Sequence, residues 1–275
     1  MNDRIEKIKN SKIQHGKLND RIYLMKLAPE DFPEIIPILN QLAKKNDYSK
    51  IFAKISNRYA DKFLENGYNI EAIVPNLYLG KENGLFLGKY FNHDRQKIPQ
   101  KELHAFKQMI KKIPAQIEIS SDSRFLFKKS TLKDTEKMGQ TYRKVFQSYP
   151  FPIFEADYLR QTLDEGSVYF GAWEDDQLIA LASAEMDLEF LNVEMTDFAV
   201  LPKYRGNQLS LCLLRQMEAD MKIRGIKTSY TIARLKSPGI NVTFLKSGYH
   251  YTGTLINNTN ICGSLESMNV WFKTL

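Results

Sequence analysis

Cysteine and histidine are scarce in this chain of 275 residues, which has two cysteines, Cys212 and Cys262, and four histidines. Two cysteines cannot build the disulfide framework of a small secreted protein, so a cytoplasmic location is expected. Neither the cysteines nor the scattered histidines have the spacing of a zinc site, and no metal is expected. No apolar run approaches the roughly 18 residues of a membrane span, and no membrane association is expected.

Basic residues are absent from one stretch of the second half of the chain. Between Gln161 and Pro202 there is no Lys, Arg or His, whereas ten acidic residues occur there. Some of these acids suit exposed turns, but Glu185, Glu194 and Asp197 are flanked by apolar residues. A negative field of this kind favours a cationic ligand.

The first half of the chain is basic. Residues 1–120 carry 21 Lys and Arg against 14 Asp and Glu, a net charge of +7, and residues 121–275 carry 18 of each. Nucleic-acid binding needs a clustered basic patch, often with aromatic residues among it. Here the lysines alternate with acids, which indicates a solvated basic face, and no nucleic-acid partner is expected.

Hydrophobic periodicity divides the chain into two α/β units, residues 1–120 and residues 121–275. In the first unit it predicts strands at 20–27, 48–55, 69–78 and 84–90, and helices at 29–45, 57–66 and 100–113. In the second it predicts strands at 124–130, 168–173, 178–186, 192–200, 227–233, 249–256 and 268–274, and helices at 132–146, 155–164, 208–224 and 238–247.

The two units contain similar short segments, FLENGY at 63–68 and FLKSGY at 244–249. Each follows a predicted strand and short helix and precedes another strand. This order indicates an internal repeat, although a coincidental helix stop at glycine is the alternative.

A basic turn containing glycine follows the strand at 192–200 and reads LPKYRGNQ before the helix that begins near Leu209. Free N–H groups and the positive end of the helix dipole make a helix start of this kind a phosphate site. The turn has neither the Lys-Ser/Thr pair of a P-loop nor the G-x-G-x-x-G of a dinucleotide-binding fold.

The order of elements, with this turn after the fourth strand of the unit, resembles the GNAT superfamily of N-acetyltransferases. In that family a Q/R-x-x-G-x-G/A turn binds the pyrophosphate of acetyl-CoA. Arg205, Gly206 and Asn207 are in register with the motif, but Gln208 and Ser210 replace its two small residues. The resemblance implies an α/β fold with a central mixed sheet flanked by helices, preceded by a partial GNAT-like half-domain.

The same resemblance implies that acetyl-CoA is the acetyl donor. The residues that it assigns to the donor are Phe198, Ala199, Val200, Arg205, Gly206, Asn207, Gln208, Leu209 and Ser210. Asn241 is expected near the pantetheine arm, and capping of its own helix is the alternative role.

Two segments, NVEMTDFAVLPKYRGN at 192–207 and GTLINNTNICGSLESMNVWFK at 253–273, resemble the beta-lysine N6-acetyltransferases more closely. Those enzymes acetylate the distal amine of β-lysine and produce a zwitterionic compatible solute. The second segment is rich in neutral amides, which suit a small zwitterion, although a polar surface loop is the alternative. Asn258, Asn260 and Glu266 are expected to bind the substrate.

The implied reaction needs a general base, because an amine protonated near pKa 10.4 cannot attack a thioester. Glu194 is the expected base, and Glu185 and Asp197 are expected to attract the amines. Strand periodicity puts Glu194 and Asp197 on opposite faces unless a bulge intervenes, and a structural role for each carboxylate is the alternative. A backbone N–H near Ala199 is expected to hold the oxyanion.

The general acid is harder to assign, because Phe244 occupies the position where many relatives have a tyrosine. Tyr249 and Tyr251 are the expected candidates. Tyr204, or departure of the thiolate without an acid, is the alternative, since a thiol near pKa 8.5 is a tolerable leaving group.

The expected function is therefore acetyl-CoA-dependent N6-acetylation of β-lysine, by direct transfer in a ternary complex with a small diamine. The oligomeric state is left open, a homodimer included. One alternative is acetylation of a polyamine, lysine or a protein lysine. Another is a non-catalytic module that binds acyl-CoA, which Gln208, Ser210 and Phe244 would favour and an intact Glu194 would not.

Overall fold

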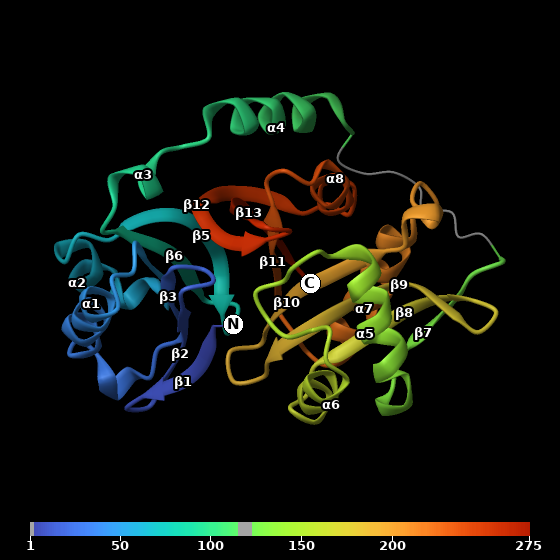
Figure 1. Ribbon diagram of the computed structural model, residues 1–275, viewed down its shortest axis with the longest axis horizontal. Coiled ribbons are helices and arrows are strands. Elements are labelled where there is room, and N and C mark those ends of the chain that lie inside the picture. Colours follow the sequence, from blue (N-terminus) through green and yellow to red (C-terminus); the bar gives the residue numbers. More distant parts are fainter. Residues whose placement is uncertain (1–2, 115–122) are drawn as a thin grey trace.

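The computed structural model describes residues 3–114 and 123–275, whose strands form two mixed β-sheets (Figure 1). The first sheet consists of β1 (Arg4–Ile8), β2 (Ser11–Gly16), β3 (Arg21–Lys26), β4 (Lys50–Ser56), β5 (Asn69–Tyr78) and β6 (Glu82–Tyr90). The second consists of β7 (Leu126–Lys129), β8 (Val168–Glu174), β9 (Gln177–Asp187), β10 (Asn192–Val200), β11 (Thr228–Arg234), β12 (His250–Ile261) and β13 (Ser264–Thr274).

Eight α-helices accompany these strands in the described ranges. They are α1 (Ile35–Lys45), α2 (Ala60–Glu65), α3 (His93–Gln96), α4 (Gln100–Lys112), α5 (Thr135–Val145), α6 (Ala156–Asp164), α7 (Leu209–Ile223) and α8 (Pro238–Lys246). None of the described helices combines the length and the apolarity that a bilayer span needs.

The predicted α/β organisation is confirmed, with helices flanking a central mixed sheet in the second half and a related half-domain before it (Figure 1). The strands β1 and β2 are missing from the prediction, because their charged and polar residues hide the alternation of an edge hairpin. The strands predicted at 249–256 and 268–274 extend through the polar segment between them and form one long hairpin, β12–β13. The predicted unit boundary near residue 120 lies outside the described residues and stays a prediction.

The internal repeat is confirmed by the strand order. The first sheet runs β1-β2-β3-β4-β6-β5, and the second contains the run β8-β9-β10-β11-β13-β12. In each run one parallel pair, β3–β4 or β10–β11, is flanked by antiparallel pairs. The helix α1 crosses over between one parallel pair and α7 between the other, so the two halves share one connectivity.

The repeated hexapeptides also have the same local structure. The rings of Phe63 and Tyr68 meet edge to face at 5.0 Å, and those of Phe244 and Tyr249 meet at 4.9 Å. The glycine before each tyrosine has a positive φ, which ends the helix and returns the chain to the sheet.

Helices α1 and α2 cover one face of the first sheet, and its other face packs against the second sheet. Phe52, Val74 and Phe86 of the first half meet Tyr230 and Val270 of the second in a shared apolar cluster. The helix α4 bridges the halves, because Phe106 contacts the rings of Tyr251 and Trp271. The two repeats are thus packed face to face.

A buried ion pair joins the halves beside this cluster. Lys50 is fully buried, and its Nζ lies 2.8 Å from Glu71 and donates to the backbone oxygen of Ile256 at 2.8 Å. The Glu71 carboxylate also accepts from the Ile256 N–H at 3.0 Å and from the Tyr90 hydroxyl. Because a buried pair of this kind is costly to break, it holds β12 of the second half in register with the first half.

Candidate active site

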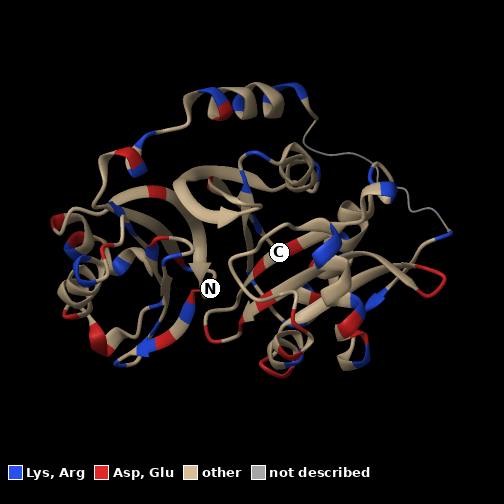
Figure 2. Ribbon diagram, in the orientation of Figure 1, with Lys and Arg blue, Asp and Glu red and all other residues tan. Residues whose placement is uncertain are grey.

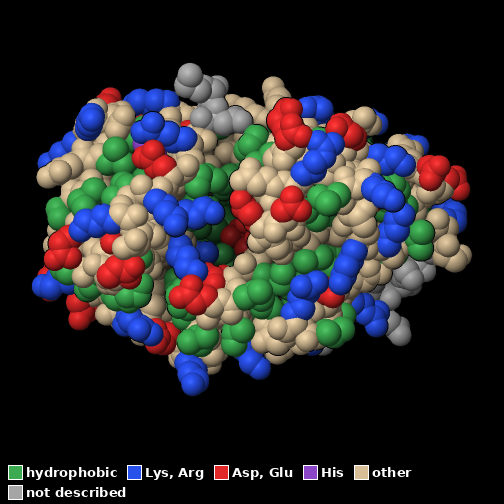
Figure 3. Space-filling model, turned by 90° about the horizontal axis from the view of Figure 1, so that it is seen from below, with side chains coloured by type: hydrophobic (Ala, Val, Ile, Leu, Met, Phe, Trp, Pro, Cys, Tyr) green, Lys and Arg blue, Asp and Glu red, His purple; other side chains and the backbone are tan. Residues whose placement is uncertain are grey.

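A cavity of about 250 Å³ lies between the two halves, and we call it the inter-half cavity. Strands β2, β3 and β4 of the first half form one wall, and β9, β10 and β11 of the second form the other. Seen from below, the molecule is hollowed between the halves, with acidic side chains inside the hollow (Figure 3). Acidic positions lie on the central strands of the second sheet, and basic positions lie on the facing first sheet (Figure 2).

Glu185, Glu194 and Asp197 all line this cavity, as the expected site required. Glu185 and Glu194 are opposite each other on β9 and β10, so they point to the same side of the sheet. Asp197 joins them because β10 has a β-bulge here. Thr196 pairs with Ser183 and Ala199 with Leu181, so β10 has one more residue than β9 between the two pairs. Asp197 has a φ of 56° in this bulge, which turns its side chain to the face that Glu194 already occupies.

Crowding and desolvation raise the pKa of all three carboxyl groups. Protein from both halves surrounds Glu185, and this burial, with Asp197 and Glu194 nearby, raises its pKa to about 8. Its side chain is nevertheless exposed where it lines the cavity. Burial likewise raises the pKa of Glu194 and of Asp197. A positively charged amine entering the cavity relieves this repulsion and favours the ionised carboxylates.

Two of the carboxylates are held in place by hydrogen bonds. Asp197 accepts from the Tyr149 hydroxyl at 2.5 Å and from the Ser183 hydroxyl at 2.8 Å. Tyr230 of β11 donates to Glu194 and accepts from Lys54 Nζ at 2.7 Å. Glu185 is not restrained in this way by any described residue, so it is free to follow a ligand.

A second cavity of about 590 Å³ lies beside the turn at 201–208, and we call it the turn cavity. The helix α7 begins there at Leu209, and the N–H groups of Leu211 and Cys212 bond back to the Gln208 oxygen. Leu209 and Ser210, the first two residues of α7, line the cavity, and their N–H groups make no such bond to any described residue. They therefore present the positive end of the helix dipole to the cavity.

Gln208 has the backbone of the glycine that it replaces. Its φ of 56° lies in the left-handed region, which a glycine adopts without strain. Gly206 also has a positive φ, 91°, and has open space where a side chain would begin. The turn therefore keeps the shape of a phosphate-binding turn although its first motif glycine is absent.

Basic side chains surround the turn cavity, namely Arg205, Arg234 and Lys236. Glu266 holds Arg234 through a two-pronged ion pair of 2.7 and 3.0 Å. The predicted substrate role of Glu266 is therefore not supported, since its carboxylate is buried against Arg234 and does not line the inter-half cavity. The positive charge and the free N–H groups fit a ligand that carries phosphates.

Strands β10 and β11 lead from one cavity to the other. Glu194 and Thr196 of β10 line the inter-half cavity, and Phe198 and Val200 line the turn cavity. The two strands pair only from Asn192 to Glu194 and then diverge. Glu194 therefore lies where the gap between the two strands begins.

Several predicted site residues have other partners. The side-chain amide of Asn241 is fully buried and makes four hydrogen bonds within the protein, to the oxygens of Arg234 and Ser237 and from Asn269 and Trp271. The amide therefore ties α8 to β13 and leaves no group for a pantetheine arm. It does not cap its own helix either, because the N-cap residue of α8 is Ser237 and no side chain caps that end. Asn207 and Ala199 do not line the turn cavity, and the Asn207 amide donates to the Tyr204 oxygen at 2.9 Å.

The two candidate general acids lie away from the carboxylates. The Tyr249 hydroxyl is buried against the Ser229 hydroxyl at 2.6 Å, and the Tyr251 hydroxyl bonds to Thr254 at 2.6 Å. Both tyrosines line a different surface hollow beside Trp271. The sequence placed them by analogy with the end of a helix, but Tyr249 precedes β12, Tyr251 lies in β12, and the hollow that they line shares no residue with either cavity.

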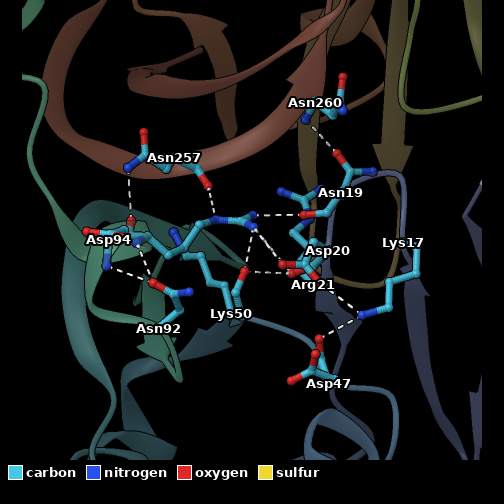
Figure 4. Close-up of polar contacts among 12 residues, drawn as sticks. Lys17, Asn19, Asp20, Arg21, Asp47, Lys50, Asn92, Asp94, Asn257 and Asn260 are labelled. Atoms are coloured by element: carbon cyan, nitrogen blue, oxygen red, sulfur yellow. Dashed lines mark hydrogen bonds and ion pairs between the residues drawn. The ribbon is translucent and has the colours of Figure 1, made fainter.

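The asparagines of β12 have divided roles. Asn258 lines the inter-half cavity, as predicted. The Asn260 N–H instead donates to Asn19 at 2.7 Å, and the Asn257 amide donates to the backbone oxygens of Arg95 and Lys97 (Figure 4). These contacts join the halves, so only part of the polar segment of β12 lines the inter-half cavity.

The sequence reasoning missed the residues that the first half contributes to the cavity. Lys12, Arg21, Tyr23 and Lys54 line it together with Tyr149 of the second half. The signal was the presence of basic residues in otherwise apolar strands, Arg21 and Lys26 in β3 and Lys50 and Lys54 in β4, which were interpreted as part of a solvated face. Among the described residues no group of His, Cys, Asp and Glu is arranged to hold a metal ion.

Residues 135–238 match the family described as the acetyltransferase (GNAT) family. Over 273 residues the chain is 40% identical to a beta-lysine N(6)-acetyltransferase of Methanococcus maripaludis, covering 98% of both proteins. It is 30% identical to the N-acetyltransferase YodP of Bacillus subtilis, over 96% of this chain and 95% of that one. It is 29% identical to a beta-lysine N(6)-acetyltransferase of Methanosarcina mazei, over 89% of this chain and 98% of that one.

Proposed function

The chain belongs to the GNAT family of acetyltransferases, and from this we propose that it acetylates the distal amine of β-lysine with acetyl-CoA as the donor. One observation supports the acceptor above all: three crowded carboxylates line one cavity between the two halves. Relatives of nearly the same length, 40% and 29% identical, are named for this reaction.

The positive groups of the turn cavity suit the negatively charged phosphates of acetyl-CoA. The N–H groups of Leu209 and Ser210 and the side chains of Arg205 and Lys236 would hold its phosphates. Bound there, acetyl-CoA supplies an acetyl group activated as a thioester. Phe198 and Val200 would line the path of its arm toward the carboxylates.

The carboxylates would prepare the amine. Glu194 lies where β10 and β11 diverge, and it would accept the proton that the ammonium must lose. Glu185 and Asp197 would draw the ammonium in, since desolvation raises the pKa of both groups and a bound ammonium would stabilise their ionised forms. Hydrogen bonds from Tyr149 and Ser183 would keep Asp197 in its orientation.

The leaving thiolate would depart without a protein acid. The one tyrosine among the described residues of the turn cavity is Tyr204, and its hydroxyl already donates to Glu174 at 2.5 Å. A thiol of pKa about 8.5 is a tolerable leaving group near neutral pH.

Competing acceptors test the proposal. The intact chain is incubated with acetyl-CoA and with β-lysine, α-lysine, spermidine and a lysine peptide, and the products are identified by mass spectrometry. We expect acetylation of β-lysine at the distal nitrogen, with a kcat/KM well above that of the other amines. Preference for another amine would overturn the acceptor, and binding of acetyl-CoA without turnover would indicate a regulatory protein.

A further inference from the structure

Arg21 of β3 is a buried cation without a counterion. Its side chain is 4% exposed and lines the inter-half cavity. No described carboxylate lies within ion-pair distance of it, whereas Lys50 is paired with Glu71 and Arg95 lies 3.6 Å from Asp20. Burial and the nearby Arg95 lower the pKa of Arg21 to about 10, so it stays charged at neutral pH. An uncompensated buried charge is costly unless a ligand supplies the opposite charge.

The guanidinium group is also held in one orientation. Its Nη1 donates to the backbone oxygen of Asn258 and to the Thr259 hydroxyl, the latter at 3.1 Å. The group lies 5.4 Å from the centre of the Tyr23 ring and 5.6 Å from that of Phe52. Its Nε is buried and has no hydrogen-bond partner, and the same is true of the Asn258 Oδ1. One unused donor and one unused acceptor therefore lie together at this end of the cavity.

This end is separated from the carboxylates by the length of a small molecule. Arg21 is paired with Lys50 across β3 and β4, and Lys54, which bonds to Tyr230 beside Glu194, lies four residues farther along β4. Four residues of strand span roughly 13 Å, and the arginine and glutamate side chains shorten that gap. An extended six-carbon diamino acid measures roughly 8 Å from carboxylate to distal nitrogen, so it fits between them.

We propose that Arg21 binds the carboxylate of the acceptor and thereby restricts the enzyme to diamino acids. The guanidinium Nε–H donates to that carboxylate, and the Asn258 Oδ1 accepts from the ammonium next to it. The distal amine then lies at Glu194 and Glu185. This inference rests on the proposed acetyl transfer to a diamine and adds the class of acceptor, which excludes polyamines.

The test compares β-lysine with β-lysinamide, which keeps both amines and replaces the carboxylate by a neutral amide. The variants are Arg21→Met and Arg21→Lys, with Lys26→Met as the matched control. Lys26 lines the same cavity, but it is paired with Asp187 and Glu189 at 3.3 and 2.7 Å. Calorimetry of acetyl-CoA binding checks that each variant is folded.

For the wild type we expect kcat/KM to be about 100-fold higher with β-lysine than with β-lysinamide, because a charged hydrogen bond is lost with the amide. Arg21→Met should lower kcat/KM for β-lysine by about the same factor. Its kcat/KM for β-lysinamide should stay within about threefold of the wild-type value. Arg21→Lys should recover part of the lost kcat/KM for β-lysine. Lys26→Met should change kcat/KM for either acceptor by no more than about threefold.

Equal use of the two acceptors by the wild type would overturn the inference, even if no Arg21 variant folds. Equal losses on both acceptors in a variant that still binds acetyl-CoA would also overturn it. Acetylation of α-lysine in place of β-lysine, with the same dependence on Arg21, would refute the proposed acceptor and support the carboxylate site. Preference for spermidine would refute the carboxylate site and leave the acetyl transfer intact.

Discussion

At the scale of single residues, the proposed base is the most direct test of the chemistry. We expect Glu194→Gln to lower kcat by about 100- to 1000-fold, because the amide cannot accept the proton of the ammonium. The KM for acetyl-CoA should not change, since Glu194 lies outside the turn cavity. Steady-state kinetics across pH 6 to 10 check this. A decrease in kcat of less than about threefold would mean that another group accepts the proton.

Glu185 makes stability depend on pH. Its pKa is raised to about 8 in the folded protein from an ordinary value of 4.5, so the folded state binds more protons than the unfolded state between these values. Its contribution is therefore fully present below about pH 4.5 and is lost as pH rises through about 8.

We expect Glu185→Gln to leave the Tm nearly unchanged at pH 4.5 and to raise it at pH 9. Thermal unfolding of both proteins over this range measures the difference. A Tm difference that does not vary with pH would mean that the carboxyl group is not desolvated in the folded protein.

Gln208 is strained where a glycine would not be. We expect Gln208→Gly to keep or raise the Tm, because relief of the left-handed backbone, about 1–2 kcal/mol, offsets the entropy of a more flexible unfolded chain, about 0.4–1 kcal/mol. Removal of the side chain also opens the turn, so acetyl-CoA should bind several-fold tighter in calorimetry. Asn207→Gly is the control, since that residue has no positive φ and bonds to Tyr204. A weaker affinity in Gln208→Gly would show that the glutamine side chain contacts the donor.

At the scale of elements, β12 holds the halves together through Asn257. Its amide donates to the oxygens of Arg95 and Lys97, and its φ is 42°. We expect Asn257→Gly, which tolerates this φ, to lower the free energy of unfolding by about 1–3 kcal/mol through the lost hydrogen bonds. Asn257→Ala should lower it further by about 1 kcal/mol, because alanine adds backbone strain. Urea unfolding of both variants separates the loss of the hydrogen bonds from the backbone strain. Equal free energies of unfolding for the two variants would show that backbone strain makes no contribution.

Sequence periodicity predicted most elements of the second half, because its strands are apolar runs bounded by clear turns. It also predicted that Glu185, Glu194 and Asp197 belong together if β10 is bulged. The bulge itself could not be predicted, since it arises from how β10 pairs with β9. The positions of Tyr249 and Tyr251 could not be predicted either, because they depend on how the start of β12 packs against α4 and β13.

At the scale of the whole molecule, the acceptor should contact both halves. We expect β-lysine binding to slow amide hydrogen exchange in β3 and β4 as well as in β9 and β10, because all four strands line the inter-half cavity. Mass spectrometry of peptides with and without β-lysine measures this. Protection confined to the second half would exclude the first half from acceptor binding.

The packing of the halves could not be predicted from one sequence. The basic residues of β3 and β4 have the composition of a solvated face, and nothing local shows that another sheet covers them. Arg21 and Lys54 were therefore read as surface charge, whereas the structure directs both into a cavity shared with distant strands. Whether these residues face solvent or a cavity is decided by contacts between strands far apart in sequence. Such contacts depend on how the two sheets fit together, which the periodicity of a single strand does not show.

The shared strand order of the two halves divides the work of recognition. Only the second copy has the turn at 201–208, while the first copy presents its sheet face to the inter-half cavity. Mutations that reshape β3 and β4 can thus change which metabolite is accepted while the donor pocket is left alone. A fold that repeats one unit thus separates two tasks in space, since residues of the first unit can vary without altering the turn cavity of the second.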